Sequence, residues 1–187
     1  MTTHSTDTDV LDVLVTDHRE ALELVAEIRS ATSPQSKRDQ ADSLISELVR
    51  HSVAEETFVY PVMKAHLPDG EQAVQHDITE HKQLEATMKE LEGTDASLPK
   101  FTELMNSLEA TLRDHVQSEE NEQFPNLRQA VPHDELVELK SKVEAMKKIA
   151  PTRPHPNAPN SALFHILVGP GVGLVDRLRD KLTGRST

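Results

Sequence analysis

Histidine and glutamate recur at one spacing in two parts of this 187-residue chain. His51 and Glu55 stand four residues apart, and His115 and Glu119 repeat that spacing 64 residues later. Each pair is followed directly by a second glutamate and, six residues after the first glutamate, by a proline. Because residues i and i+4 of an α-helix lie on one face, each pair can hold the same ion or neighbouring ions.

Two further histidines repeat at nearly the same offset. His18 lies in the sequence TDHR, and His81 lies in the sequence TEHK 63 residues later. The remaining pairs of this spacing, His76 with Glu80 and His81 with Glu85, do not repeat, because the positions equivalent to His76 and Glu85 are not ligand types. On a helix, His76 points about 140° away from His81, so we expect it to be solvated.

The repeat predicts one centre built from six donors, which are His18, His51, Glu55, His81, His115 and Glu119. Six donors exceed the four of a zinc site, and imidazole is a poor ligand for calcium or magnesium. They suit two transition-metal ions, each held by two histidines, with the two glutamates bridging. This mixture favours iron or manganese. Octahedral iron would keep positions free for an oxo or hydroxo bridge and for an outside ligand.

Other chemistry is excluded by composition or spacing. The chain has no cysteine, which excludes disulfides, thiolate zinc sites, iron–sulfur clusters and cysteine nucleophiles. The zincin motif H-E-x-x-H is absent, and ferritin-like proteins place Glu before His rather than after it. A metal-free structural bundle is the remaining alternative. It predicts that His51→Ala and His115→Ala leave stability unchanged or improve it.

The apolar spacing predicts the helices that must position these residues. Helix-forming residues dominate before residue 169, and strand-like alternation is missing. We expect helices over residues 8–31, 37–66, 71–92 and 98–129, and a fifth over 133–150. Beyond Glu55, the core stripe of the second helix is predicted to continue through Phe58 and Val62. Short connections favour an all-α fold, an antiparallel up-down four-helix bundle with a fifth helix, over residues 1–150.

Residues 151–187 are predicted to be a Pro-rich extension that ends in a short helix. Four prolines among residues 151–161 indicate an extended linker. We expect the sequence GPGVG at residues 169–173 to form a turn that lets the last helix dock on the bundle or on a second subunit, as in a homodimer. His165, in the apolar run of residues 162–168, is expected to be packed or interfacial.

Four side chains beside the predicted ligands have less specific roles. Tyr60 is expected to pack as a helix-end aromatic, like its repeat partner Phe124. Its alternative is a role at the centre as a hydrogen-bond donor, terminal ligand or radical site. Glu56 and Glu120 lie about 100° from the ligand face, so we expect them to be solvated or to hydrogen-bond the histidines. Glu122 is expected to be exposed at a helix end.

Charge and hydropathy indicate the cellular setting. With 20 Lys+Arg against 32 Asp+Glu, the formal net charge is −12, which argues against nucleic acid or an anionic membrane as a partner. The N-terminal sequence lacks the basic and apolar regions of a secretory signal, and no apolar run approaches 18 residues. We therefore expect a cytoplasmic protein.

The pattern H…HxxxE…H…HxxxE, with its doubled H-x-x-x-E-E and following proline, resembles the hemerythrin-like, or HHE cation-binding, domain family over about residues 8–130. The Pro-rich tail is similar to that of actinobacterial members. The resemblance implies an up-down four-helix bundle with a non-haem, oxo- or hydroxo-bridged centre of two Fe ions that handles O₂, peroxide or nitric oxide. Manganese or zinc are the expected substitutes for iron.

The donor set departs from that of the oxygen-carrying hemerythrins, which use five histidines and an aspartate as well as a glutamate. Four histidines and two glutamates leave a more open centre, which suits reaction with peroxide or nitric oxide better than reversible O₂ carriage. We expect a catalase-like or peroxidase-like oxidoreductase, or a protein that handles nitric oxide. The alternative is a sensor or storage module for iron, O₂ or nitric oxide that signals through its C-terminal tail without turnover.

Overall fold

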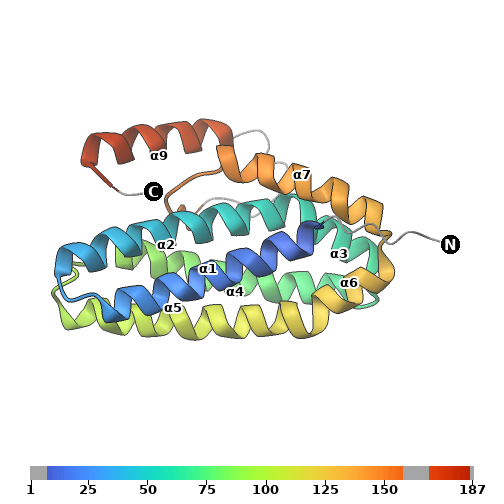
Figure 1. The fold of residues 1–187 in the computed structure, drawn as a ribbon, viewed down its shortest axis with the longest axis horizontal. Coiled ribbons are helices and arrows are strands. Elements are labelled where there is room, and N and C mark those ends of the chain that lie inside the picture. The colour runs from blue at the N-terminus through green and yellow to red at the C-terminus, as the bar shows by residue number, and fades with distance from the viewer. Residues whose placement is uncertain (1–7, 158–168, 186–187) are drawn as a thin grey trace.

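A computed structural model describes residues 8–157 and 169–185, and helices make up most of both segments (Figure 1). In chain order the elements are α1 (Val10–Ser30), α2 (Pro34–Ala54), the π turn η1 (Glu55–Val59), α3 (Tyr60–His66), α4 (Gly70–Glu92), α5 (Pro99–Ser118), the π turn η2 (Glu119–Gln123), α6 (Phe124–Ala130), α7 (His133–Ile149) and α9 (Gly169–Thr183). The all-α prediction is confirmed.

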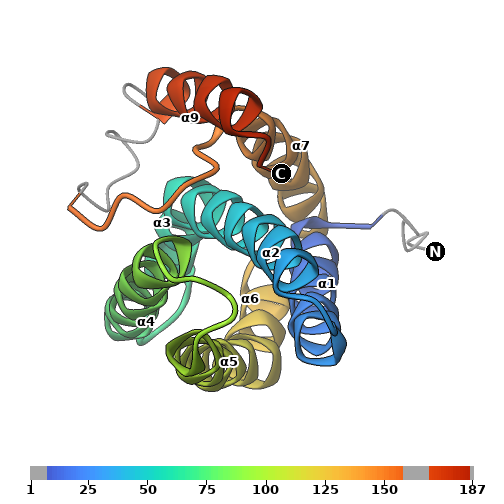
Figure 2. The same cartoon turned by 90° about the vertical axis from the view of Figure 1, so that its left-hand side faces the viewer.

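The bundle consists of four long helical rods, and Figure 2 shows it end-on. They are α1, α2 continued by η1 and α3, α4, and α5 continued by η2 and α6. The first two make one helix hairpin and the last two make the other, with extensive contacts inside each hairpin. Within the described segments, no helix is long and apolar enough to cross a bilayer.

The start of α1 is tied to the second hairpin. Asp9 caps the helix by accepting hydrogen bonds from the backbone N–H groups of Leu11 and Asp12, and Asp12 caps the backbone of Asp9 in return. Arg128 of α6 donates to both carboxylates, at 2.5 Å each. These bonds fix α6 beside the start of α1, with Arg128 one turn after Phe124.

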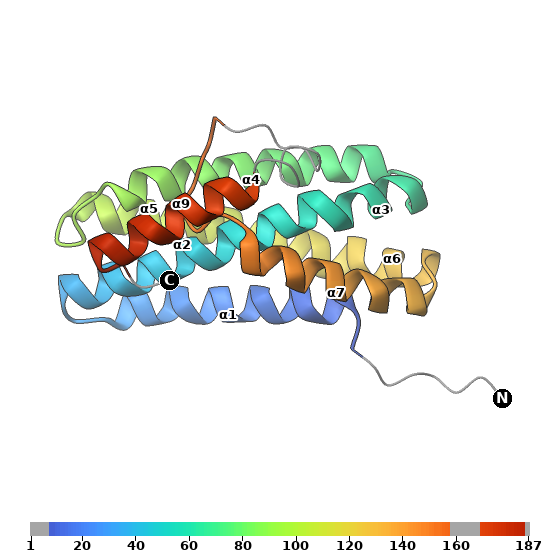
Figure 3. The ribbon, with the colours of Figure 1, turned by 90° about the horizontal axis from the view of Figure 1, so that it is seen from above.

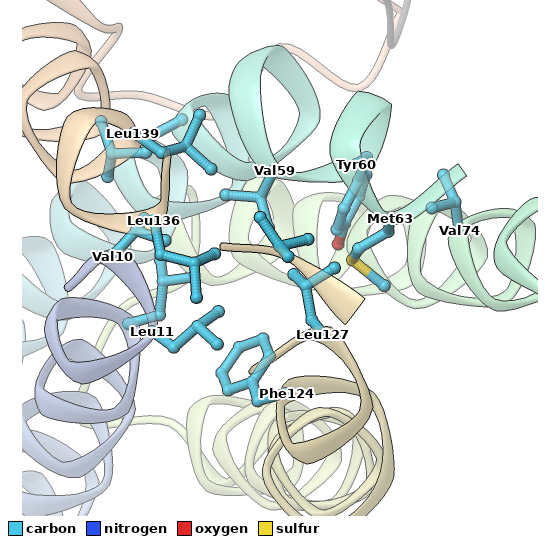
Figure 4. Packing of buried hydrophobic residues seen from close by; sticks show 14 of the residues in the cluster. Val10, Leu11, Val59, Tyr60, Met63, Val74, Phe124, Leu127, Leu136 and Leu139 are labelled. Atoms are coloured by element: carbon cyan, nitrogen blue, oxygen red, sulfur yellow. The ribbon is translucent and has the colours of Figure 1, made fainter. Parts of the chain in front are cut away.

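The apolar core is divided into two clusters with a polar layer between them. One cluster surrounds Val25, Leu44, Leu91 and Phe101, toward the end where α1 joins α2. The other occupies the opposite end, where residues of α1, η1, α3, α6 and α7 interlock (Figure 4). Each long rod passes from one cluster to the other, and at the crossing each contributes a buried histidine.

Helix α7 covers the second cluster from outside. It packs across α1 and α2, and Figure 3 shows it beside both of them. Its buried residues are the four that the periodicity predicts, which are Leu136, Leu139, Val143 and Met146. The end of the bundle where the two π turns lie is therefore closed on one side by a fifth helix.

The predicted core stripe after Glu55 is wrong by one residue. Phe58 and Val62 are only partly buried, whereas Val59 and Met63 are fully buried. The cause is the π turn η1, because an i→i+5 turn holds one more residue than an α turn and shifts every later side chain around the axis.

The C-terminal helix also differs from its prediction. The sequence GPGVG at residues 169–173 is the first part of α9 rather than a turn, since proline is tolerated in the first turn of a helix. Gly173 lies against α7, where an added Cβ would meet the carbonyl oxygen of Ile149 at 2.3 Å. Helix α9 thus docks on α7 of its own chain, which is the first of the two predicted alternatives. Residues 158–168, including His165, lie outside the described residues, and the homodimer stays a prediction.

Docking turns the polar side of α9 inward. Asp176 and Asp180 are buried, where they pair with His155 and Arg153 of the segment after α7. The large apolar side chains of α9 face outward instead, and the exposed ones are Leu174, Val175, Leu178 and Leu182. Ion pairs and hydrogen bonds, rather than an apolar stripe, hold this helix to the bundle.

Candidate metal centre

Four imidazoles meet in the polar layer, one from each long helix. His18 of α1, His51 of α2, His81 of α4 and His115 of α5 are each no more than 4% exposed. Nε2 of His18 lies 3.2 Å from Nε2 of His51, and the ring centroids of His81 and His115 are 4.8 Å apart. The repeated histidines of the sequence therefore do converge.

Two carboxylates lie between these imidazoles. Glu55 and Glu119, each the first residue of a π turn, are completely buried. Oε2 of Glu55 lies 3.0 Å from Nε2 of His51 and 3.4 Å from Nε2 of His81. Oε2 of Glu119 lies 3.5 Å from Nε2 of His115 and 3.3 Å from Nε2 of His18. Each carboxylate thus contacts one histidine from each hairpin.

Several of these polar atoms lack a conventional partner. All four carboxylate oxygens of Glu55 and Glu119, and Nε2 of His115, make no hydrogen bond of acceptable geometry to any described residue. Buried polar atoms without a partner cost free energy that a bound cation would recover. The orphaned atoms all face the same centre, so the donor chemistry fits metal ions.

The separations support this fit. Ligand atoms lie within 4.8 Å of one another for His18, His51, Glu55, His115 and Glu119. Their closest separations, 3.0 to 3.5 Å, are those expected of neighbouring donors around an ion with bonds of about 2.1 Å. His81 lies outside this group of five, but its Nε2 lies 3.4 Å from Oε2 of Glu55.

Two of the imidazoles are backed by a carboxylate from their own hairpin. Nδ1 of His51 lies 3.3 Å from Oδ2 of Asp17, and Nδ1 of His115 lies 3.2 Å from Oε2 of Glu80. Asp17 and Glu80 are equivalent positions of the repeat, each directly before a histidine. Their role could not be predicted from the repeat, because each contacts a histidine of the neighbouring helix.

The other two imidazoles are backed from the opposite hairpin. Nδ1 of His18 lies 2.9 Å from Oε1 of Glu120, and Nδ1 of His81 lies 3.0 Å from Oε1 of Glu56. The sequence predicts that these two glutamates are either solvated or bonded to histidines. In the structure each contacts the Nδ1 atom of a histidine. A carboxylate on Nδ1 fixes the ring and directs Nε2 to the centre, as in many metal sites.

The carboxylates control the protonation of the centre. Burial disfavours the charged form of His51, but Glu55 and Asp17 outweigh burial and raise the pKa of His51 to about 10. Burial likewise opposes ionisation of Glu55, but His51 and His81 hold the pKa of Glu55 well below its usual range. Without a cation, protons on the imidazoles balance the buried carboxylates, and a metal ion must displace them.

The π turns bring an aromatic ring to each end of the centre. In a continuous α-helix Tyr60 would point about 140° away from Glu55. In η1 the backbone N–H of Tyr60 bonds to the carbonyl of Glu55, and its ring stacks on His81 with the hydroxyl oxygen 3.2 Å from Nε2. Figure 4 shows this hydroxyl directed into the bundle. Tyr60 is therefore buried in the core and its hydroxyl also contacts His81.

The equivalent ring of the other half is Phe124, which stacks on His18 with centroids 6.0 Å apart. The two halves therefore match in their donors and differ by one hydroxyl. A second difference lies nearby: Asp77 and Gln123 form a buried pair, at 2.9 Å, where the first half carries Leu14 and Val59. One half is apolar at these positions and the other is polar.

The remaining predictions concern the surroundings. Glu122 is exposed and the side chain of His76 is 58% exposed, as the sequence predicts. His155 lies partly under α9, where its Nε2 is 2.9 Å from Oδ2 of Asp176. A small pocket between α1 and α2 lies beside the centre, and its polar lining residues are Asp17, His18, Glu20, Glu47 and His51.

Comparisons with known proteins agree with this geometry. The model of the hemerythrin HHE cation-binding domain matches residues 9–127. A crystal structure of a hemerythrin HHE cation-binding domain-containing protein from Mycobacterium kansasii is similar with a TM-score of 0.66 and 25% identity, over 76% of this chain and 86% of that one.

Two curated proteins are similar in sequence. An uncharacterised hemerythrin-like protein of Schizosaccharomyces pombe is 29% identical over 94% of this chain and 87% of its own length. A protein of Nostoc sp. named as a DNA nickase is 23% identical over 75% of this chain, which spans only 40% of that protein.

Proposed function

Because the chain belongs to the hemerythrin HHE cation-binding domain family, we propose that its buried centre holds two iron ions and reacts with a small oxidant such as hydrogen peroxide. The observation that carries the proposal is the donor set itself. Four histidines direct Nε2 to one buried point, each backed by a carboxylate, and two glutamates with orphaned oxygens lie between them.

The donors divide between two ions by proximity. His18 and His51 lie together on one side, and His81 and His115 lie together on the other. Glu55 and Glu119 each contact both sides, so each would help to hold metal ions together with histidines of both hairpins. Iron suits this mixture of imidazole and carboxylate, and manganese or zinc would occupy the same donors. Bound iron would supply the redox chemistry by cycling between its ferrous and ferric states.

Tyr60 is the residue of the chain best placed to assist that chemistry. Its hydroxyl oxygen contacts the Nε2 atom of His81 that a metal ion would take. With a metal ion held at Nε2 of His81, the Tyr60 hydroxyl would be free to donate its own proton toward an oxidant in the centre. The equivalent residue of the other half, Phe124, has no hydroxyl, so Tyr60 is the member of this pair that can donate a proton.

Metal analysis and turnover test the proposal together. The purified full-length chain is expected to contain about two iron ions and to show an absorption band in the near-ultraviolet or visible range. It is also expected to release O₂ from hydrogen peroxide. His51→Ala and His115→Ala should lose iron and stability, because a metal-stabilised core loses its ligands. Iron-free protein whose stability is unchanged by these substitutions would favour the metal-free bundle.

A sensor is the second candidate, and one chain of contacts favours it. Lys147 of α7 donates to Asp17 at 2.6 Å, and Asp17 bonds His51, so the centre is linked to the helix on which α9 docks. A sensor would bind O₂ or nitric oxide without turnover and change the hydrogen exchange of α9. Fast peroxide turnover with unchanged exchange in α9 would support the enzyme instead.

A further inference from the structure

A second group of metal-binding side chains lies on α4, outside the centre. His76, Asp77 and Glu80 each offer a ligand atom, and these atoms lie within 4.8 Å of one another. His76 and Glu80 are one helical turn apart, with Nε2 of His76 at 3.4 Å from Oε1 of Glu80. The His76 side chain is 58% exposed, so ions in solution can reach this group.

Asp77 is the member of the group that gives independent evidence for a bound ligand. It is completely buried, and its Oδ1 accepts a hydrogen bond from Gln123 Nε2 at 2.9 Å. Its Oδ2 is buried and has no hydrogen-bond partner among residues 8–157 and 169–185. A buried carboxylate oxygen without a partner is costly, and a cation would satisfy it. Burial and the nearby Glu119 raise the pKa of Asp77 to about 7.

Glu80 joins this group to the centre. Its Oε1 faces His76, whereas its Oε2 accepts from Nδ1 of His115 at 3.2 Å. Glu80 therefore offers one carboxylate oxygen to this group and the other to His115 of the buried centre. A set of one imidazole and two carboxylates, completed by water on the exposed side, suits Mn²⁺, Fe²⁺ or Zn²⁺ better than calcium or magnesium.

We propose that His76, Asp77 and Glu80 form an outer site for one divalent first-row transition-metal ion, separate from the buried centre and joined to it through Glu80. The first half has no counterpart, because the positions equivalent to His76 and Asp77 are Val13 and Leu14. The chain should therefore bind one such ion.

Manganese titration tests the outer site on the full-length chain. The free Mn²⁺ signal in electron paramagnetic resonance measures binding to protein whose centre has first been loaded with iron, and iron is quantified before and after. We expect one Mn²⁺ per chain beyond the centre. His76→Val copies Val13 at an exposed position and should weaken this binding at least tenfold with the iron content unchanged. His66→Val, at an exposed histidine of α3, is the matched control.

Asp77→Asn is the second variant, since asparagine keeps the size and the bond to Gln123 but removes the charge. It too should weaken Mn²⁺ binding, and its melting temperature reports whether it folds. Equal Mn²⁺ binding by the parent chain and His76→Val, or no Mn²⁺ bound beyond the centre, would overturn the outer site. The readout is a difference between variants, so it stays informative even if the centre takes no iron.

Discussion

At the residue scale, the centre is a set of paired groups rather than six isolated ligands. The ring of each histidine is fixed between a carboxylate on Nδ1 and the shared centre on Nε2. Such partners raise the basicity of the imidazole and prevent the ring from turning. Metal affinity should therefore depend on residues that never touch the metal.

Asp17 offers a direct test of these partners. Asp17→Asn removes the charge behind His51, and we expect it to weaken iron binding about 10- to 100-fold while the helices remain folded. Competition with a chelator measures the affinity. Asp114→Asn is the matched control, because Asp114 also directly precedes a ligand histidine but is exposed. Equal losses in both variants would show a general charge effect instead.

Replacing Tyr60 by phenylalanine makes this position the same as Phe124, its equivalent in the other half. Tyr60→Phe removes only the hydroxyl beside His81 and keeps the ring that stacks on it. We expect the iron content to be retained and peroxide turnover to fall about 100-fold, within the usual range for loss of a proton donor. Phe124→Tyr provides the reverse comparison. Full turnover by iron-loaded Tyr60→Phe protein would assign proton donation to another group.

The convergence of these six side chains could be predicted from the sequence because they form three pairs at nearly the same offset, as with His51 and His115. Asp17 and Glu80 also repeat, but their role could not be predicted. Each contacts a histidine on the adjacent helix, and that relation depends on how the helices pack side by side. Asp77 carried no signal, because its equivalent position is an ordinary leucine.

At the element scale, the π turns place both a buried glutamate and an aromatic ring. Each turn begins at one of the two central glutamates and ends just before an aromatic–proline pair, Tyr60-Pro61 or Phe124-Pro125. Proline has no N–H and its ring clashes with the carbonyl four residues earlier, so a wider turn relieves both conflicts. The two prolines were the available signal for these turns, and periodicity alone placed Phe58 wrongly in the core stripe.

Helix α9 depends on one close backbone approach. Gly173→Ala would push a methyl group into the carbonyls of Ile149 and Ala150, so we expect docking to lose about 1–3 kcal/mol. Faster proteolysis within α9 would report the loss. Gly171→Ala is the control, since nothing lies within 4 Å of its added Cβ, and it should leave docking intact. Similar proteolysis of both variants would contradict the close contact.

At the scale of the whole molecule, the bundle could be predicted and the position of its last helix could not. The predicted bounds of the long helices agree with the structure to within a few residues, because amphipathic spacing and the breaks at Pro68 and Gly93 determine them. Helix α9 binds through buried aspartates and exposes its leucines. Hydrophobic periodicity predicts the opposite orientation of α9, so the observed orientation could not be predicted from the sequence.

The attachment of α9 should depend on pH. A hydrogen bond from Nε2 of His155 to Asp176 raises the pKa of this partly buried histidine above its usual value. A histidine whose pKa rises on folding stabilises the folded form fully below its unfolded pKa of about 6.5. That contribution is lost as the pH rises through the folded pKa. With His155 partly exposed, we expect the effect to stay below about 1 kcal/mol.

Proteolysis of α9 at pH 6 and pH 8.5, in the parent chain and in His155→Gln, measures this dependence. The parent should be better protected than the variant at pH 6, and the difference should shrink at pH 8.5. The ion pair of Arg153 with Asp180 keeps its charge across this range and serves as the constant part of the attachment. A difference that grows with pH would reverse the assignment.

The division of the centre between two hairpins affects how such a protein can diversify. Each hairpin supplies two histidines and one glutamate, so two identical hairpins could in principle complete the same donor set as a symmetric pair. In a symmetric pair every mutation appears twice. A single chain carrying both hairpins escapes that constraint, so one half can carry Tyr60 while the other carries Asp77 with Gln123. Covalent fusion thus allows the two faces of one centre to specialise separately.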